Sequence, residues 1–190
     1  MKSKTRFFNS YIVSPLFFSI FIALISSAGC RKSSSNVNQL PPATQTGSNT
    51  FGAMVNGTVW VPKGFNGTAN LSISYDPGYA NGTLNIAAYR ILDTVSFHST
   101  ALGFYIDSLN FYKFPHTFLL KSNSNNDLGY TGYPCEYNTA DSLTYSEGSI
   151  IITKLDLQKG IISGTFSGMI SKSSCPSVTI TDGRFDMKLN

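Results

Sequence analysis

The chain has 190 residues, and its 14 Lys and Arg against 10 Asp and Glu give a formal net charge of +4. The first 29 residues hold three of the basic residues and no acidic one, so the rest of the chain has 11 basic against 10 acidic residues. A nearly neutral chain presents no basic face to a polyanion, and the composition therefore argues against a nucleic-acid partner.

The N-terminus has the pattern of an export signal. Lys2, Lys4 and Arg6 form a positive start, and an apolar run follows from Ile12 to Ile25. This run is shorter than the ~20 residues that a membrane-spanning helix needs. A positive start, a short apolar run and small residues behind it are typical of a secretory signal. We predict a signal peptide over residues 1–29, with a short transmembrane anchor as the alternative.

The end of this signal resembles a lipobox, in which small residues precede a cysteine that becomes lipidated. The matching residues are Ala28, Gly29 and Cys30. The resemblance implies that the signal is cleaved before Cys30 and that a lipid on this residue attaches the chain to a membrane. We expect a location in the cell envelope, at the outer membrane, facing the periplasm or the cell surface. An ordinary cleaved signal with an incidental cysteine is the alternative.

The residues after the predicted anchor differ in composition from the rest of the chain. Residues 31–50 are rich in Ser, Asn, Gln and Thr and include a Pro-Pro pair, so they have little to bury. Such a composition predicts a flexible tether over residues 30–50. Residues 51–190 have the length of one domain and are enough to build a core without depending on disulfides.

Residues 51–190 predict an all-β domain. Short runs of Val, Ile, Thr, Phe and Tyr alternate with Gly, Asn, Asp and Pro, and no long helical period is present. We therefore expect one antiparallel β-sandwich or barrel-like domain. The predicted strands are 51–55, 58–62, 70–75, 83–91, 95–106, 116–121, 148–156, 160–171, 176–181 and 184–189.

Two dipeptides predict tight hairpins. Asn56-Gly57 and Asp182-Gly183 each lie between apolar runs, and both pairs accept the positive φ angles of a type I′ turn. At the second pair, a two-residue turn would place Ile180 opposite Phe185 and the polar residues on the other face. We expect both pairs to connect neighbouring strands.

Three segments resemble a family of Bacteroidota lipoproteins of unknown function. They are the opening FGAMVNGTVW of residues 51–60, the segment KGIISGTF of residues 159–166 and the closing ITDGRFD of residues 180–186. The resemblance implies an all-β domain on a lipid anchor. It implies no catalytic residues.

Two cysteines remain after the lipidated one. Cys135 and Cys175 lie in loop-like contexts, and an oxidising compartment would favour a disulfide between them. The sequence does not show whether their Cα atoms come close enough, so the pairing stays open. No histidine or further cysteine lies nearby to complete a metal site.

The segment from Ser122 to Gly148 is the candidate ligand loop. It is long, polar and carries Tyr130, Tyr133 and Tyr137. Long loops are often functional, and tyrosines can both stack on a ligand and hydrogen-bond to it. The alternative is that these tyrosines cover one end of the core.

The evidence for catalysis is weak. Asp182 and Asp186 could serve as the carboxylate pair of a glycoside hydrolase, although the expected turn and a surface ion pair with Arg184 explain them as well. His98 and His116 have no acidic or cysteine neighbour that would suggest a triad. We therefore expect no cofactor and no metal.

These observations predict a membrane-anchored binding module without enzymatic activity, whose partner is a glycan, a small ligand or a protein. A structural envelope lipoprotein is the second hypothesis and a hydrolase is the third. A deep apolar cavity would favour a small ligand, and an exposed tyrosine patch would favour a glycan or a protein. Two carboxylates facing each other across a cleft would favour the hydrolase.

Overall fold

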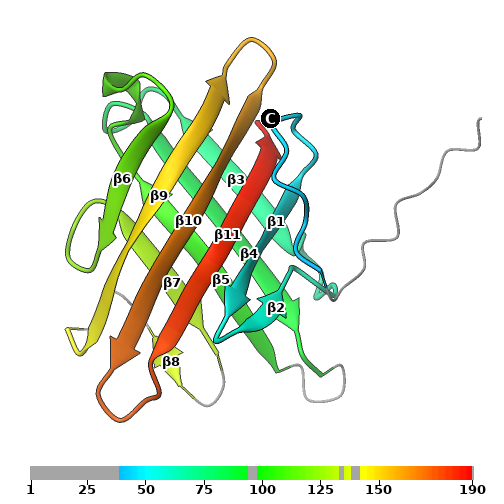
Figure 1. Ribbon diagram of the computed structural model, residues 1–190, viewed down its shortest axis with the longest axis vertical. Coiled ribbons are helices and arrows are strands. Elements are labelled where there is room, and N and C mark those ends of the chain that lie inside the picture. The colour runs from blue at the N-terminus through cyan, green and yellow to red at the C-terminus, as the bar shows by residue number, and fades with distance from the viewer. Residues whose placement is uncertain (1–38, 94–97, 133–134, 138–141, 190) are drawn as a thin grey trace, which may run out of the picture. The chain divides into compact units, whose positions relative to one another are not determined.

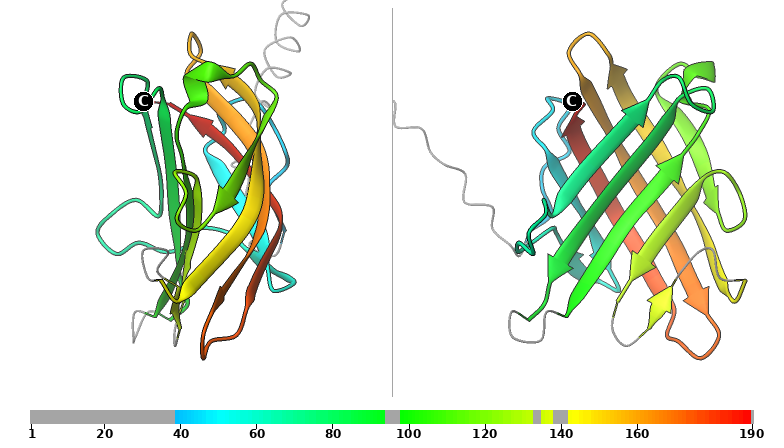
Figure 2. Two further views of the ribbon diagram at one scale, coloured as in Figure 1. Left: turned by 90° about the vertical axis from the view of Figure 1, so that its left-hand side faces the viewer. Right: turned by 180° about the vertical axis from the view of Figure 1, so that it is seen from behind.

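The computed structural model describes residues 39–93, 98–132, 135–137 and 142–189, and this part of the chain is mostly β-structure. Two antiparallel sheets pack face to face as a sandwich and do not close into a barrel (Figures 1 and 2). The prediction of an all-β antiparallel domain is confirmed, and the sandwich is the architecture adopted. The elements are β1 (Thr50–Val55), β2 (Thr58–Trp60), β3 (Leu71–Asp76), β4 (Thr83–Ile91), β5 (Ser99–Ile106), the 3-10 helix η1 (Leu109–Phe111), β6 (His116–Lys121), β7 (Asp127–Thr131), β8 (Glu136–Tyr137), β9 (Thr144–Asp156), β10 (Ile161–Lys172) and β11 (Val178–Lys188).

The first sheet has six strands in the order β2-β1-β11-β10-β9-β6, and the second has five in the order β3-β4-β5-β7-β8. We call them sheet A and sheet B. In Figure 1, sheet A lies in front of sheet B, and the strands of the two layers cross at an angle. The chain passes from sheet A to sheet B after β2 and returns to sheet A after β5 through η1.

The core lies between the sheets, where alternate residues of each strand point inward. Aromatic rings from the two layers interlock, because Phe104 of sheet B lies 5.4 Å from Phe166 and 5.3 Å from Phe185 of sheet A, between ring centroids. All three side chains are buried. Burial of a side chain of this size contributes roughly 1.5–3 kcal/mol, so the two sheets are held together mainly by apolar contact.

The Asn56-Gly57 hairpin is present as predicted. Asn56 has φ 48° and Gly57 has φ 75°, and the strands on either side pair through Val55 and Thr58. The turn is also fixed to sheet A, since the Asn56 side chain accepts a 2.8 Å hydrogen bond from the backbone N–H of Thr179.

The second predicted hairpin is wrong. Asp182 and Gly183 lie inside β11, which runs unbroken from Val178 to Lys188 and pairs with β1 on one side and β10 on the other. Against both neighbours the register shifts by one residue at this point, and Asp182 has φ 52°. The dipeptide therefore forms a β-bulge, in which only Asp182 has a positive φ angle and the chain does not reverse.

The predicted loop from Ser122 to Gly148 contains strands that the sequence did not indicate. Its described residues include β7, β8 and the beginning of β9. Because these strands are short or rich in polar residues, their alternation is masked by turn-forming residues around them. The rest of the predicted strands match observed ones to within a few residues, and residues 95–97 of the predicted strand 95–106 lie outside the described residues.

The predicted tether also differs from the structure where it is described. Residues 41–48 lie on the outer face of sheet A and hydrogen-bond to β9 and β11. We call residues 41–48 the strap. The packed domain therefore begins before Phe51, because the polar residues of this segment find partners on the sheet. The predicted signal peptide and Cys30 lie outside the described residues.

Within the described ranges, no helix is long and apolar enough to cross a membrane.

Candidate functional site

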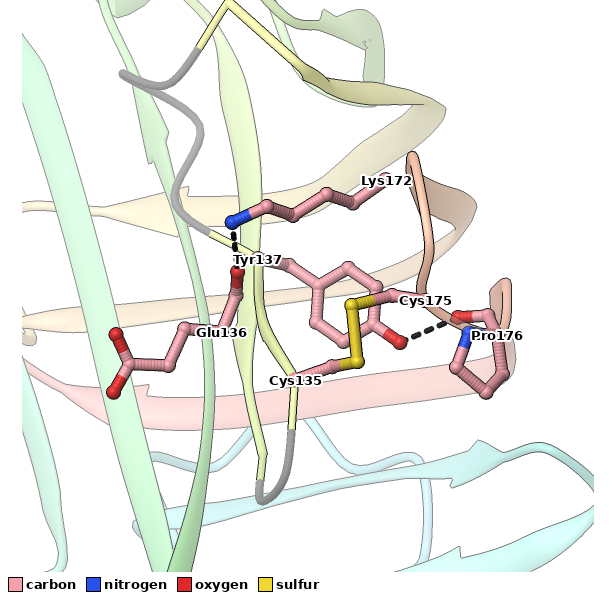
Figure 3. The surroundings of a disulfide bond; sticks show 6 residues. All are labelled: Cys135, Glu136, Tyr137, Lys172, Cys175 and Pro176. Atoms are coloured by element: carbon pink, nitrogen blue, oxygen red, sulfur yellow. Dashed lines mark hydrogen bonds between the residues drawn. A yellow bond between two sulfur atoms is a disulfide. The ribbon is translucent and has the colours of Figure 1, made fainter.

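One end of the sandwich is closed by a disulfide. Cys135 and Cys175, whose pairing the sequence left open, are bonded, with their Cα atoms 6.0 Å apart (Figure 3). Cys135 precedes β8 of sheet B, and Cys175 lies between β10 and β11 of sheet A, so the bond links the two layers. Lys172 donates a 2.9 Å hydrogen bond to the backbone carbonyl of Glu136 across the same junction.

Two of the three candidate tyrosines lie at this disulfide end and face the core. Tyr137 is 4% exposed and donates a hydrogen bond to the carbonyl of Pro176 (Figure 3). Tyr130 is half-buried, and its ring centroid is 6.0 Å from that of Tyr137. Burial raises the pKa of both hydroxyls. Tyr133 lies outside the described residues. Tyr130 and Tyr137 therefore form no exposed patch and pack against the end of the core, and both also line part of an open hollow in sheet B.

A different group of aromatic residues is exposed at the opposite end. Tyr79 lies in the loop between β3 and β4, and Phe111 and Tyr112 lie in the segment between β5 and β6. Their side chains are 65%, 68% and 41% exposed. We call these three residues the aromatic end. Tyr112 also stacks on His116, with ring centroids 3.7 Å apart.

The two loops that carry the aromatic end are bound to one another. The backbone N–H groups of Ser108, Leu109 and Asn110 donate hydrogen bonds of 2.9–3.1 Å to the carbonyls of residues 80–82. The Asn110 side chain donates to the carbonyl of Pro77 and accepts from the Tyr75 hydroxyl. Because the backbones are tied together in this way, the exposed aromatic side chains project from a fixed support.

Three of the eight described non-glycine residues with a positive φ angle lie in the same two loops. Ala80, Asn81 and Ser108 all have positive φ angles between 45° and 60°. A non-glycine residue in this region costs of order 1–3 kcal/mol and persists only where the surroundings enforce it. Such residues cluster at binding and active sites, so the strain marks this end as a candidate site.

An open hollow lies on the outer face of sheet B, and its lining runs from Asn85 and Tyr105 at one end to Glu136 and Tyr137 at the other. Its volume is about 540 Å³. The floor consists of small residues in register on neighbouring strands, because Gly103 pairs with both Ala87 and Gly129. Asn85 and Asp127 pair with Tyr105 one step further along the strands. The hollow thus presents amide, carboxylate and hydroxyl groups beside an apolar floor.

Tyr105 connects the hollow with the aromatic end. Burial raises the pKa of its hydroxyl, and the nearby Tyr79 and Asp107 raise it further, whereas a hydrogen bond with Thr83 lowers it. Tyr105 lies three residues before Ser108, whose backbone N–H donates to the carbonyl of Ala80, in the loop that carries Tyr79. The neutral hydroxyl can both donate and accept a hydrogen bond.

Asp186 is the most strongly perturbed carboxylate among the described residues. It is 1% exposed and lies on the outer face of sheet A beneath the strap. One carboxylate oxygen accepts hydrogen bonds from the hydroxyl of Thr44 at 2.6 Å, from the hydroxyl and the N–H of Thr46 at 3.1 and 2.9 Å, and from the N–H of Ser48 at 3.3 Å. The other accepts from the N–H of Gly47 at 2.7 Å and the hydroxyl of Ser163 at 2.8 Å.

These donors determine the ionisation of Asp186. Burial alone would raise the pKa of this carboxyl, but the hydrogen bonds from Thr44, Thr46, Gly47 and Ser163 outweigh burial and hold the pKa well below the ordinary 3.8. A carboxylate that accepts several hydrogen bonds is stabilised in its charged form. Asp186 is therefore a fixed anion whose acceptor capacity is used by the protein itself.

This arrangement does not resemble the carboxylate pair of a glycoside hydrolase. Asp182 is exposed on the bulge, whereas Asp186 is enclosed by the strap and by Ser163. The expected surface ion pair of Arg184 with Asp186 is also wrong, because Asp186 is buried and Arg184 hydrogen-bonds to the carbonyls of Asp182 and Pro41. The two acids do not face each other across a cleft.

Three other features of the described residues bear on catalysis and ligand binding: a histidine, possible metal ligands and surface hollows. His116 packs between Tyr112 and Phe118 at the edge of sheet A, which is a structural environment. Among the described residues, no three His, Cys, Asp or Glu side chains come together as a possible metal site. Three hollows lined by described residues are open rather than deep, so none of these three is the deep apolar cavity that would favour a small ligand.

Sequence reasoning missed the aromatic end. Residues 102–118 are rich in aromatic side chains, and without the strand register the sequence predicts most of them to be in the core. The signal that could have distinguished Phe111 and Tyr112 is their position beside Ser108, Asn110 and Pro115, because polar residues and Pro are typical of a loop.

No family model, curated protein or solved structure matches the chain. Fold and site therefore define only a class: a disulfide-linked antiparallel β-sandwich with an exposed aromatic end.

Proposed function

We propose that this protein is a lipid-anchored binding module of the bacterial cell envelope and that the aromatic end contacts its ligand. The observation that carries the proposal is the exposure of Tyr79, Phe111 and Tyr112 on two loops that are hydrogen-bonded to each other. Exposed aromatic side chains leave apolar surface in water that a ligand can cover. Because the loops are already held in place, their backbone loses little conformational entropy on binding.

A glycan is the ligand that this surface fits best. Aromatic rings provide flat apolar faces for the C–H groups of a sugar, and the neighbouring hollow offers Asn85, Tyr105 and Asp127 as hydrogen-bonding groups for hydroxyls. The hollow is open to solvent and is lined by residues of β4, β5, β7 and β8, so it can accommodate part of a longer glycan.

The proposal is tested by glycan binding to the mature chain carrying Cys30→Ser, which removes the lipid but leaves the domain unchanged. We expect specific binding on a glycan array, with affinity reduced at least tenfold in a Tyr79→Ala, Phe111→Ala double variant. Tyr145→Ala is the matched control, because Tyr145 is also exposed, at 43%, but lies on the outer face of sheet A.

Two outcomes would contradict this function. Binding that survives the double variant would exclude the aromatic end as the site. A flat array with a domain that melts cooperatively would instead favour a protein partner or the structural role.

The anchor is tested separately by metabolic labelling with an alkyne fatty acid. We expect label on the wild-type chain and none on Cys30→Ser. The part of the sequence that supports the anchor is the apolar run followed by Ala28, Gly29 and Cys30. A labelled Cys30→Ser chain, or an unlabelled wild type, would show that the chain is not a lipoprotein acylated at this position.

A further inference from the structure

One edge of sheet B is a long strand without a neighbour among the described strands. β3 is the outer strand of sheet B and pairs only with β4 (Figure 2). The ladder between them runs from Leu71 to Asp76 without a register shift, so β3 is straight and regular along its length. A regular edge of this kind is a template on which another strand can pair.

The direction of the backbone groups of β3 follows from its pairing with β4. The N–H of Tyr89 donates a 2.9 Å hydrogen bond to the carbonyl of Asn70, one residue before β3. Because hydrogen-bonded residues alternate along an antiparallel pair, Ser72 and Ser74 also bond to β4. The N–H and carbonyl groups of the residues between them, Leu71, Ile73 and Tyr75, therefore point away from β4, toward the edge.

The other three edge strands of the described sheets are protected in ways that β3 is not. β2 has three residues and β8 has two, and a short edge offers little backbone for pairing. β6 follows Pro115 and ends at Lys121, whose backbone N–H already donates to the carbonyl of Asn126. β3 has six residues and contains no Lys, Arg or Pro. Its single charged residue, Asp76, lies at the end and accepts hydrogen bonds from the turn that follows.

The side chains of β3 also leave apolar surface at this edge. Leu71, Ile73 and Tyr75 pack against the core but are only half-buried, since no described strand covers their outer side. Ser72 and Ser74 are exposed on the opposite face of the strand. A strand with the same alternation of apolar and polar residues would extend both faces of sheet B and cover the apolar row.

We propose that two copies of this chain associate through β3, antiparallel about a two-fold axis at Ile73, and join their B sheets into one continuous sheet. In this register Ile73 lies opposite Ile73 of the second copy, and Leu71 lies opposite Tyr75. Each of these pairs can exchange two backbone hydrogen bonds. On the other face, Ser72 lies opposite Ser74. Such a contact is isologous, because the same strand supplies both sides.

The sequence of β3 determines this register. A shift by one residue would place Leu71 or Ile73 opposite a serine and set apolar against polar faces. A shift by two residues toward the C-terminus would place Leu71 opposite Pro77, which has no N–H to donate. In the proposed register Asp76 lies opposite Asn70, so no like charges meet. These features make β3 complementary to itself, which favours a second copy over an unrelated strand.

The dimer goes beyond the proposed function and holds whether or not Cys30 carries a lipid. The two-fold axis of an antiparallel strand pair is perpendicular to the sheet, so the outer faces of both B sheets point the same way. The hollow lined by Asn85, Tyr105 and Asp127 would then occur twice on one continuous surface.

The test is sedimentation velocity of the mature chain carrying Cys30→Ser, at concentrations from about 1 μM to about 1 mM. We expect a monomer at the lower end and a dimer at the upper end. A variant with Ser72→Lys and Ser74→Lys sets lysine opposite lysine in the dimer, and we expect its dissociation constant to be at least tenfold higher. A variant with Ser72→Glu and Ser74→Glu should be weakened likewise, and an equimolar mixture of the two should form the dimer again.

The matched control places the same charges on the other long edge strand. Thr117 and Leu119 of β6 are exposed, and a variant with Thr117→Lys and Leu119→Lys should dimerise as the wild type does. Amide hydrogen exchange reports the contact without any substitution. The N–H groups of Leu71, Ile73 and Tyr75 should exchange at least tenfold more slowly in the dimer than in the monomer.

Three outcomes would overturn the proposal. The first is a wild-type chain that stays monomeric up to about 1 mM. The second is a dimer that the β6 variant weakens and the β3 variants leave intact, or one in which exchange at residues 71, 73 and 75 does not slow, because the contact would then lie elsewhere. The third is a pair of β3 charge variants that fold, as denaturant unfolding shows, but stay monomeric when mixed, which would exclude the antiparallel register.

Discussion

The two ends of the sandwich use aromatic residues in opposite ways. At the disulfide end, Tyr130 and Tyr137 turn toward the core, and the Tyr137 hydroxyl donates to the carbonyl of Pro176. At the aromatic end, Tyr79 and Phe111 are more than 60% exposed, on loops held by backbone hydrogen bonds. The comparison shows that exposure, rather than the number of tyrosines, separates side chains that stabilise this fold from side chains that are available to a ligand.

The largest expected effect is at the disulfide end. Replacing both cysteines, Cys135→Ser with Cys175→Ser, should lower the free energy of unfolding by about 4 kcal/mol, as loop-closure entropy implies for a 40-residue separation. Denaturant unfolding of the oxidised wild type and the double variant measures this. A loss below about 1 kcal/mol would mean that the two layers are held at this end by packing alone.

Tyr137 provides the next test, because it is the buried partner in the comparison. Tyr137→Ala removes a side chain that is 4% exposed and should lower the free energy of unfolding by about 3 kcal/mol. Tyr137→Phe keeps the ring and removes only the hydrogen bond to Pro176, so we expect it to cost about 1 kcal/mol. If the two variants were equally destabilised, the hydroxyl rather than ring packing would be the main contribution.

Asp186 and Asp182 extend the comparison to two carboxylates on one strand. Because hydrogen bonds hold the pKa of Asp186 below 3.8, its contribution to stability is complete above about pH 5 and is lost as the pH falls below its ordinary pKa. Asp186→Asn should therefore lower the free energy of unfolding by about 2 kcal/mol at neutral pH. It should also reduce the loss of this free energy that the wild type shows at acidic pH. Asp182→Asn should show the same loss at acidic pH as the wild type. Chemical denaturation at a series of pH values measures both.

The two dipeptides with positive φ show how far the sequence predicts the fold. Asn56-Gly57 and Asp182-Gly183 are both predicted to have positive φ angles, and this holds for both residues of the first pair but only for Asp182 of the second. Whether such a site becomes a turn or a bulge depends on the strands beside it. Residues 184–188 continue along β1 and β10, and this long-range pairing was not visible in the local pattern.

The candidate site was harder to predict than the fold. Alternation of apolar and polar residues is a local signal, and it located most of the strands. The partner of Asp186 lies about 140 residues away in sequence, within a segment whose polar composition predicted only a tether. Likewise, Phe111 follows a segment, residues 108–110, that is held by hydrogen bonds to residues 80–82 of the other loop. Long-range contacts of polar backbone leave no periodic pattern in a sequence.

The smallest change in the free energy of unfolding is expected at the aromatic end. Phe111 is 68% exposed, so Phe111→Ala removes little buried surface and should change the free energy of unfolding by no more than about 0.5 kcal/mol. Its hydrogen-exchange pattern at residues 108–110 should stay as in the wild type, because the backbone bonds to residues 80–82 do not involve the ring. A loss of 2 kcal/mol or more would show that Phe111 supports the loops, and the distinction between a stabilising end and an available end would then fail. An unchanged fold with reduced glycan binding would instead place Phe111 among the residues that contact the ligand.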